Sequence, residues 1–198
     1  SHDGVRGTLE CLMIKDHVEI SHLSDLPAQT GIGSSSSFVV GLINCLYKLQ
    51  GRDVCKRELA NLAIGVERVH LGECGGIQDQ IWAAYGGFNS IEIDTAGFFK
   101  VKPMPVSDEF VRDFLSRSVL LYTGKSRQSF EIAQSHDQAD SQYKDKIHDI
   151  SYEAYNAFAA EKLDEVGRFL HQSWLAKQKI SPLISTEEVS TIYDTLKK

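Results

Sequence analysis

The stretch P-A-Q-T-G-I-G-S-S-S-S, residues 27–37, is rich in glycine and serine and stands directly before an apolar helical pattern. Its two glycines, Gly31 and Gly33, allow backbone angles that other residues rarely adopt and let amides approach a ligand closely. The serines at 34–37 occupy the expected first turn of a helix, where unpaired N–H groups and the helix dipole favour negative charge. The stretch therefore predicts a loop that binds phosphate.

Apolar residues behind this loop recur at helical spacing and predict a helix that holds the loop in place. They are Phe38, Val39, Leu42, Ile43, Leu46 and Leu49. The P-loop pattern G-x-x-x-x-G-K-[ST] is absent, and so is the third glycine of a dinucleotide fingerprint. A flexible Gly/Ser linker is the alternative, but Pro27 and the apolar helix on either side argue against it.

Composition and charge limit the class of protein. The chain has 198 residues, of which 42% are hydrophobic, and this is enough for one large domain or two small ones. A net charge of −6 without a Lys/Arg cluster argues against nucleic acid or an anionic membrane surface as partner. Without a bilayer-length apolar run or a signal pattern, the sequence predicts a cytoplasmic protein. The four cysteines form no C-x-x-C pair, which predicts reduced, mostly buried thiols and argues against zinc.

Two of the carboxylates that follow the loop are candidates for the site, Glu67 and Asp79. Glu67 lies at the edge of the apolar stripe of a helix that Asp53 could cap, so Glu67 could face a cleft or be a solvated surface residue. Asp79 follows a glycine-rich turn, in the first turn of another helix, where the dipole favours its ionised form. It could orient or deprotonate a hydroxyl, hold a cation, or be an ordinary N-terminal aspartate. Phosphoryl transfer needs a phosphate cradle, a cation ligand and a group that positions the hydroxyl, and these three regions supply all of them.

These motifs resemble those of the GHMP kinases. The loop P-x-x-T-G-x-G-S-S-S-S resembles their phosphate-binding motif, and the run from Glu67 to Gln80 resembles the sugar-kinase form E-x(11)-D with its G-I-x-D-Q ending. The resemblance implies ATP and Mg²⁺, with Asp79 as the catalytic aspartate and Ser35 and Glu67 as magnesium ligands. It also implies a set of nucleotide-binding residues: Thr30, Gly31, Ile32, Gly33, Ser34, Ser35, Ser36 and Ser37.

Two later segments, residues 120–127 and 171–186, resemble the heptose-phosphate branch of the same family, where they frame the substrate pocket. The resemblance implies phosphorylation of a sugar at its anomeric hydroxyl, most similar to D-glycero-D-manno-heptose 7-phosphate, with fucose- or galactose-type sugars as alternatives. The implied substrate residues are Gly76, Gln78, Thr123, Gly124, Arg127 and Lys177. Arg127 could pair with a phosphate or a carboxylate through its guanidinium, or be a solvated surface arginine.

The resemblance implies an α+β fold with a partial ribosomal-S5-like domain and a mostly helical C-terminal domain. The prolines at 103 and 105 predict a boundary that assigns residues 1–104 to the first and 105–198 to the second. The patterns predict a helix within 1–16, strands at 18–21 and 119–122, a hairpin at 88–102, and helices from about Ser129 onwards.

Segments that supply other walls of the site in this family, one at each end, have no match in the sequence, so we expect a fragment or a shortened copy. A non-catalytic module that binds sugar or nucleotide therefore stays an alternative. A homodimer is expected only from the frequency of dimers among soluble proteins.

Overall fold

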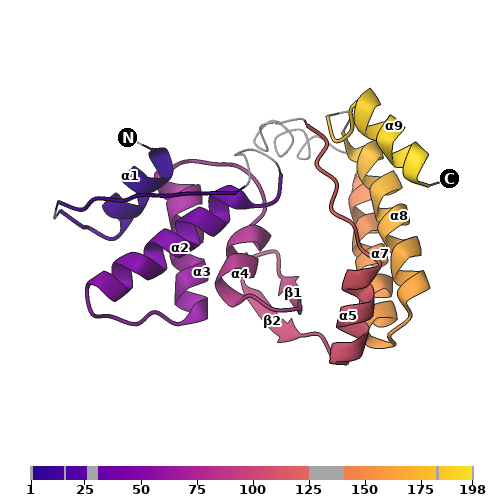
Figure 1. The fold of residues 1–198 in the computed structure, drawn as a ribbon, viewed down its shortest axis with the longest axis horizontal. Helices are drawn as coiled ribbons and strands as arrows, with labels where there is room; N and C mark the ends of the chain where they lie inside the picture. Colours follow the sequence, from indigo (N-terminus) through magenta and orange to yellow (C-terminus); the bar gives the residue numbers. More distant parts are fainter. Residues whose placement is uncertain (1, 16, 26–30, 125–140, 182, 198) are drawn as a thin grey trace. The chain divides into compact units, whose positions relative to one another are not determined.

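The computed structural model describes residues 2–15, 17–25, 31–124, 141–181 and 183–197. The chain divides into two compact units, of which the first comprises residues 1–87 with 124–130 and the second 88–123 with 131–198. Figure 1 gives the order of the helices and strands in each unit. The glycine loop and both candidate carboxylates belong to the first unit.

Helix α2 (Ser34–Leu49) is the central element of the first unit and begins directly after the glycine loop. Its buried face consists of Ser36, Val39, Val40, Leu42, Ile43, Leu46 and Tyr47. Helices α1 (Asp3–Cys11), α3 (Lys56–Gly65) and α4 (Gln78–Tyr85) contact it (Figure 1). Each large apolar side chain buried in this way contributes about 1.5–3 kcal/mol, so α2 holds the loop firmly, as its apolar spacing predicts.

Helix α3 is capped by Cys55, whose Sγ accepts a hydrogen bond from the Glu58 amide at 3.5 Å. The cap predicted at Asp53 is wrong. Asp53 lies too far before Lys56 for its carboxylate to reach the amides of the first turn, and it pairs with Lys48 at the surface instead.

The end of α3 runs into a π-helical turn, η1 (Val66–His70). In this turn the Leu71 amide donates to the Val66 carbonyl, five residues earlier, at 2.9 Å. A π turn is wider than an α turn, so side chains in it point in directions that an α-helical wheel does not predict. The turn contacts both α1 and α3.

The start of the chain agrees with the sequence patterns only in part. The helix predicted within residues 1–16 is confirmed as α1. The strand predicted at 18–21 is wrong, because residues 17–25 contain neither helix nor strand. A strand needs a neighbour for its backbone hydrogen bonds, and no described segment pairs with this one.

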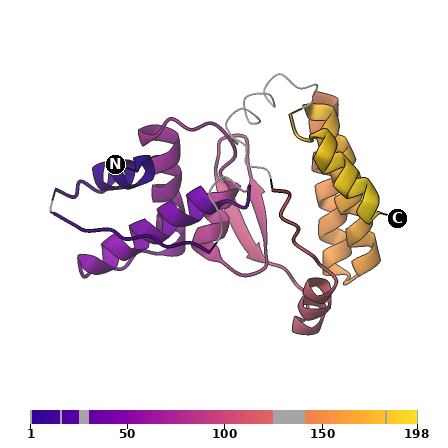
Figure 2. The same ribbon diagram turned by 45° about the horizontal axis from the view of Figure 1, so that its top comes forward.

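The second unit begins with the predicted hairpin, which is confirmed. Strands β1 (Asn89–Ile93) and β2 (Phe99–Pro103) pair antiparallel with Ile91 opposite Val101 (Figure 2). The Asp94 carboxylate closes the turn by accepting bonds from the amides of Ala96 and Phe98, both at 2.9 Å. Together with the helices, this hairpin makes the fold α+β and mostly helical, as predicted.

Four helices complete the described part of this unit: α5 (Asp108–Ser116), α7 (Ser141–Ala159), α8 (Leu163–Ile180) and α9 (Glu187–Leu196). The predicted helical pattern is therefore confirmed for 141–196. Helices α7 and α8 lie side by side (Figures 1 and 2). Thr186 caps α9 by accepting from the Val189 amide at 3.3 Å. An aromatic cluster joins the hairpin to α5 and α7 through Phe88, Phe110, Phe114 and Phe158.

The residues around the predicted boundary at 104/105 are tied into this second unit. The Met104 amide donates to the Phe88 carbonyl at 3.0 Å, and the Ser107 amide donates to the Glu161 carboxylate at 2.6 Å. The boundary at 104/105 thus lies within the second compact unit, and as a division between domains it stays a prediction.

The strand predicted at 119–122 is wrong, since these residues form no strand and all four side chains are exposed. An apolar run becomes a strand only when another segment pairs with it, and among the described residues none does. The predicted burial of the thiols is also wrong. All four cysteines are free, with Cys45, Cys55 and Cys74 exposed and Cys11 half-buried. They lie in turns or on solvent-facing sides of helices.

Candidate active site

The glycine loop is placed where an anion could bind. Gly33 is the N-cap of α2 and has φ +71°, and Gly31 has φ +77°, so both positions need the left-handed conformation that glycine allows. The first helical bond runs from the Ser37 amide to the Gly33 carbonyl at 3.0 Å. The amides of residues 34–36 therefore have no acceptor within the helix and lie at the positive end of its dipole.

Asp79 lies beside this loop. A Cβ atom built on Gly33 would lie 3.3 Å from Asp79 Oδ2, so the start of α2 and the start of α4 meet at this point. Asp79 is in the first turn of α4, as predicted, and its side chain is exposed. A carboxylate that remains accessible next to a phosphate cradle can contact a hydroxyl of a bound substrate.

Glu67 is buried behind the loop, with 2% of its surface exposed. Ser36 Oγ donates to Glu67 Oε2 at 3.1 Å, and Gln80 Nε2 donates to the same oxygen. Glu67 Oε1 is buried and has no partner among the described residues. Burial raises the pKa of the Glu67 carboxyl above its ordinary value, and the hydrogen bonds from Ser36 and Gln80 oppose that rise.

The helical wheel misplaces Glu67. It predicts an edge position, either facing a cleft or solvated, whereas the side chain is buried because the π turn of η1 directs it inward. The serine that contacts Glu67 is Ser36, while the predicted magnesium ligand Ser35 is exposed. Ser35 and Glu67 as magnesium ligands stay a prediction.

Arg68 fastens the second glycine-rich turn to the π turn. Its Nη1 donates to the Glu73 carbonyl at 2.7 Å, and its Nη2 donates to the Gly76 carbonyl. The turn that leads into Asp79 is thus held at two points from the neighbouring element. The candidate substrate residue Gly76 belongs to this turn, and Gln78 begins α4 with an exposed side chain.

Sequence reasoning missed the roles of three residues: Ser36 and Gln80 as donors to Glu67, and Arg68 as the residue that fastens the turn. One signal was available for Gln80, because a polar residue stands on the face of α4 that buries Ile81 and Ala84. No comparable signal marks Ser36 among four consecutive serines.

The remaining candidates belong to other segments of the chain or lie outside the described residues. Thr30 and Arg127 are outside the described ranges. Gly124 is exposed with φ +70°. Thr123 and Lys177 belong to the second unit, where both are exposed. The part of all these residues in binding stays a prediction.

The donor set around Glu67 suits a hard divalent cation. Two buried oxygens, Glu67 Oε1 and Gln80 Oε1, lack partners among the described residues, and such oxygens are the ligands that Mg²⁺ prefers. The described residues contain no cluster of three or more His, Cys, Asp or Glu side chains that could hold a metal. Magnesium is commonly held by one or two carboxylates together with substrate phosphates, so the residues fit a cation that arrives with a nucleotide.

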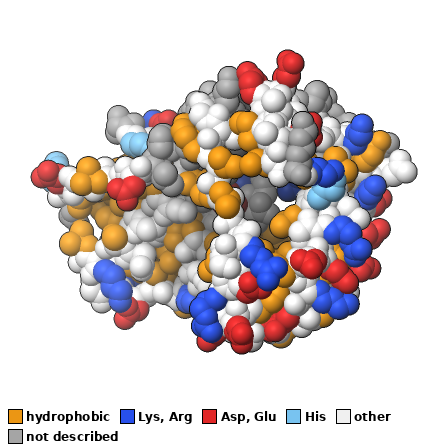
Figure 3. Space-filling model, turned by 45° about the vertical axis from the view of Figure 1, so that its right-hand side comes forward, with side chains coloured by type: hydrophobic (Ala, Val, Ile, Leu, Met, Phe, Trp, Pro, Cys, Tyr) orange, Lys and Arg blue, Asp and Glu red, His pale blue; other side chains and the backbone are white. Residues whose placement is uncertain are grey.

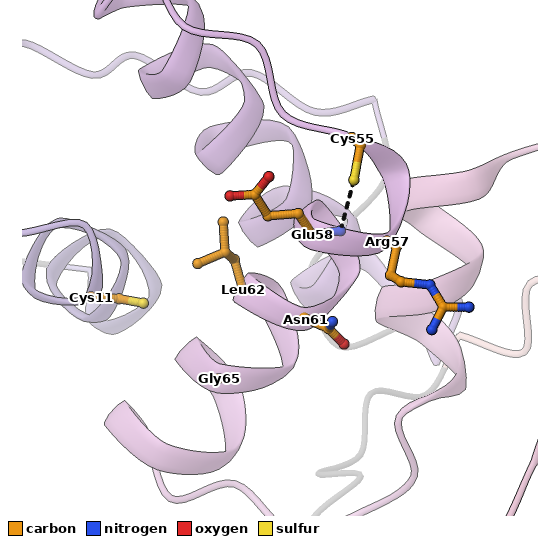
Figure 4. A pocket seen from close by; sticks show the side chains of 7 residues that line it. All are labelled: Cys11, Cys55, Arg57, Glu58, Asn61, Leu62 and Gly65. Atoms are coloured by element: carbon orange, nitrogen blue, oxygen red, sulfur yellow. Dashed lines mark hydrogen bonds between the residues drawn. The ribbon is translucent and has the colours of Figure 1, made fainter. Parts of the chain in front are cut away.

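A surface hollow of about 390 Å³ lies away from these residues, between α1 and α3 (Figure 4). It is lined by residues that include Cys11, Cys55, Asn61 and Leu62, and none of the candidate site residues contributes to it. Charged side chains of both signs are interspersed on the face of the molecule seen in Figure 3. Within the described part of the chain, no helix is long and apolar enough to cross a membrane.

A protein-family model matches the part of the chain that contains these residues. Residues 5–87 match the model of the GHMP kinases N terminal domain, a range that contains the glycine loop, Glu67 and Asp79. Residues 5–87 therefore belong to the GHMP kinase family. The match ends at Gly87, where the first compact unit also passes into the second.

Two relatives are similar to this chain over most of its length. D-glycero-alpha-D-manno-heptose 7-phosphate kinase of Campylobacter jejuni is 31% identical over 176 residues, which cover 86% of this chain and 52% of the relative. The bifunctional fucokinase/GDP-fucose pyrophosphorylase of Arabidopsis thaliana is 23% identical over 181 residues, which cover 86% of this chain and 17% of the relative.

A solved structure agrees with the fold. The D-glycero-D-manno-heptose 1-phosphate kinase of Bacteriodes thetaiotaomicron superposes with a TM-score of 0.68 and 25% identity, over 90% of this chain and 56% of that one. The present chain therefore spans about half the length of the heptose kinases that it matches.

Proposed function

We propose that this protein is a sugar kinase that uses ATP and Mg²⁺ to phosphorylate an anomeric hydroxyl. The observation that carries the proposal is the approach of Asp79 to Gly33. It puts an accessible carboxylate beside the amides that would hold the terminal phosphates of a nucleotide. Phosphoryl transfer depends mainly on positioning and on electrostatic stabilisation, and this pairing supplies a residue for each.

In this proposal the loop residues 31–37 hold the triphosphate through their amides and the dipole of α2. Asp79 orients the attacking hydroxyl and takes up its proton, which is chemically favourable because an anomeric hydroxyl is more acidic than an ordinary alcohol. Ser35 and Glu67 are the residues that would hold Mg²⁺. Bound there, the cation would neutralise part of the charge on the phosphates.

The substrate that we propose is D-glycero-D-manno-heptose 7-phosphate, giving the 1,7-bisphosphate. The first heptose kinase named above supports this choice, since its name carries that substrate. A second candidate is a fucose-type sugar, supported by the similarity to the fucokinase. Arg127 and Lys177 are the candidates for contact with the phosphate of a heptose 7-phosphate.

The test is a turnover assay with the protein expressed from its complete reading frame. ATP and Mg²⁺ are combined with heptose 7-phosphate, heptose 1-phosphate, fucose, galactose or mannose, and ADP release is measured. We expect turnover with heptose 7-phosphate. Turnover with fucose instead would favour the second candidate. Nucleotide binding without turnover on any sugar would contradict the kinase and favour a non-catalytic binding module.

A further inference from the structure

Three elements of the first unit bring polar side chains together in its interior. Ser36 of α2, Glu67 of η1 and Gln80 of α4 are 6%, 2% and 1% exposed. Polar side chains so deeply buried cost free energy unless hydrogen bonds compensate them. This cluster, the Glu67 cluster, therefore needs an explanation beyond the packing of three helices.

The hydrogen bonds within the Glu67 cluster are asymmetric. Both donors, Ser36 Oγ and Gln80 Nε2, bond to Glu67 Oε2, while Oε1 receives no bond from any described residue. Leaving a buried acceptor unpaired costs about 1–3 kcal/mol, and more when it is charged. A cluster that served stability alone would distribute its two donors over the two oxygens.

The two donors also come from different helices. Ser36 is fixed by the first turn of α2, and Gln80 stands beside the buried Ile81 on α4. Two donors that converge from separate rigid elements hold the carboxylate in one orientation, as the partners of metal ligands do in other proteins.

We propose that Gln80, assisted by Ser36, is a positioning residue that holds Glu67 by Oε2 and keeps Oε1 for a divalent cation. This inference rests on the proposed function, in which Glu67 is a magnesium ligand. Gln80 follows Asp79 directly, so one turn of α4 carries the carboxylate that faces the substrate and the amide that orients the cation ligand.

The experiment uses Mn²⁺ as the probe, because free Mn²⁺ is counted directly by electron paramagnetic resonance. The dissociation constant of Mn²⁺ is measured in the presence of saturating ADP. The variants are Gln80→Met, which keeps the volume and removes the donor, and Ser36→Ala. Gln50→Met is the matched control, since Gln50 is exposed at the end of α2. Each variant's unfolding midpoint in urea is measured separately.

A double-mutant cycle separates positioning from mere packing. Gln80→Met is combined with Glu67→Gln, which removes the charge of the proposed ligand. We expect Gln80→Met to weaken Mn²⁺ binding about 10-fold or more, as the loss of a ligand's hydrogen-bond partner usually does. In the Glu67→Gln background we expect no further loss, because Gln80 acts through Glu67. Ser36→Ala should give a smaller loss, and Gln50→Met none.

Mn²⁺ affinity in these variants decides the inference. Unchanged Mn²⁺ binding in both Gln80→Met and Ser36→Ala would overturn the inference and leave the proposed kinase intact. An equal loss in both Glu67 backgrounds would also overturn it, since Gln80 would then act through general packing. If Gln80→Met does not fold, the same double-mutant cycle is made with Ser36→Ala and Glu67→Gln, and its Mn²⁺ affinities test the inference. Mn²⁺ binding that Glu67→Gln does not weaken overturns the inference, and the sugar turnover assay then judges the kinase independently.

Discussion

Two regions of the first unit each contribute one carboxylate, and they differ in environment. Glu67 lies in the π turn η1, buried and held by two donors, whereas Asp79 lies at the exposed start of α4 beside Gly33. The difference suits two tasks. A cation ligand benefits from a fixed orientation in the interior, while a group that receives a substrate hydroxyl must be reachable from solvent.

The largest effect that tests this comparison should come from Asp79→Asn. We expect kcat/KM for the sugar to fall about 10³-fold, because asparagine cannot take up the hydroxyl proton. Stability should change by less than about 0.5 kcal/mol, since the side chain is exposed. The measurements are ADP release and urea unfolding.

Asp53→Asn is the matched control for that variant, because Asp53 is an exposed aspartate whose carboxylate pairs with Lys48 at the surface. Its activity should be unchanged. Activity of Asp79→Asn within tenfold of the unsubstituted protein would contradict the role given to Asp79.

A smaller effect should distinguish the two loop glycines. Alanine at Gly33 or at Gly31 adopts the same unfavourable positive φ, at a cost of about 1–3 kcal/mol. Only at Gly33 would the new Cβ press on Asp79, at 3.3 Å from Oδ2, since nothing lies within 4 Å of a Cβ at Gly31. We therefore expect both variants to bind ATP more weakly.

The turnover number separates these two variants. It should fall about 10-fold further in Gly33→Ala than in Gly31→Ala, because displacement of a catalytic group is costly. Nucleotide affinity is measured by calorimetry and kcat by ADP release. Equal losses of kcat in the two variants would show that the approach of Asp79 to Gly33 has no part in catalysis.

The smallest effect is the change that Glu67→Gln should cause in the free energy of unfolding. Burial raises its pKa above the ordinary value of 4.5, so the folded protein binds this proton more tightly than the unfolded chain. The stability contributed by the group is present below pH 4.5 and is lost as pH rises through the raised folded value. We expect Glu67→Gln to be more stable by about 1 kcal/mol at pH 7 without divalent cations. The difference should shrink as the pH falls towards 4.5.

Urea unfolding in a chelator across this pH range checks that prediction. Glu10→Gln, at an exposed position of α1, is the control and should leave the urea unfolding midpoint unchanged. A Glu67→Gln variant less stable than the unsubstituted protein at pH 7 would mean that the charged form is well compensated, and the contrast with Asp79 would disappear.

Several parts of this protein could be predicted from sequence because their causes are local. Glycine spacing followed by apolar residues at helical intervals predicted the loop and α2, and the glycine-rich turn predicted Asp79 in a first helical turn. The hairpin followed from two apolar runs around Asp94 and Gly97. In each case the residues that decide the structure are close together in the chain.

Other predictions were wrong because the structure at those positions depends on residues far away in the chain. The runs at 18–21 and 119–122 have strand-like patterns, yet a strand depends on a partner segment that its own residues do not specify. Asp53 failed as a cap because the helix begins later than its pattern suggests. Such boundaries depend on hydrogen bonds that periodicity does not reveal.

The sequence by itself determined the chemical parts of the site: glycines that allow a phosphate cradle, serines at a helix start, and two carboxylates in the right order. Only the tertiary structure decided how those parts are used. Packing of α2, η1 and α4 buried Glu67 against Ser36 and Gln80 and left Asp79 exposed beside Gly33. The physical reason is that burial and hydrogen-bond partners arise between elements far apart in the chain, which no local pattern encodes.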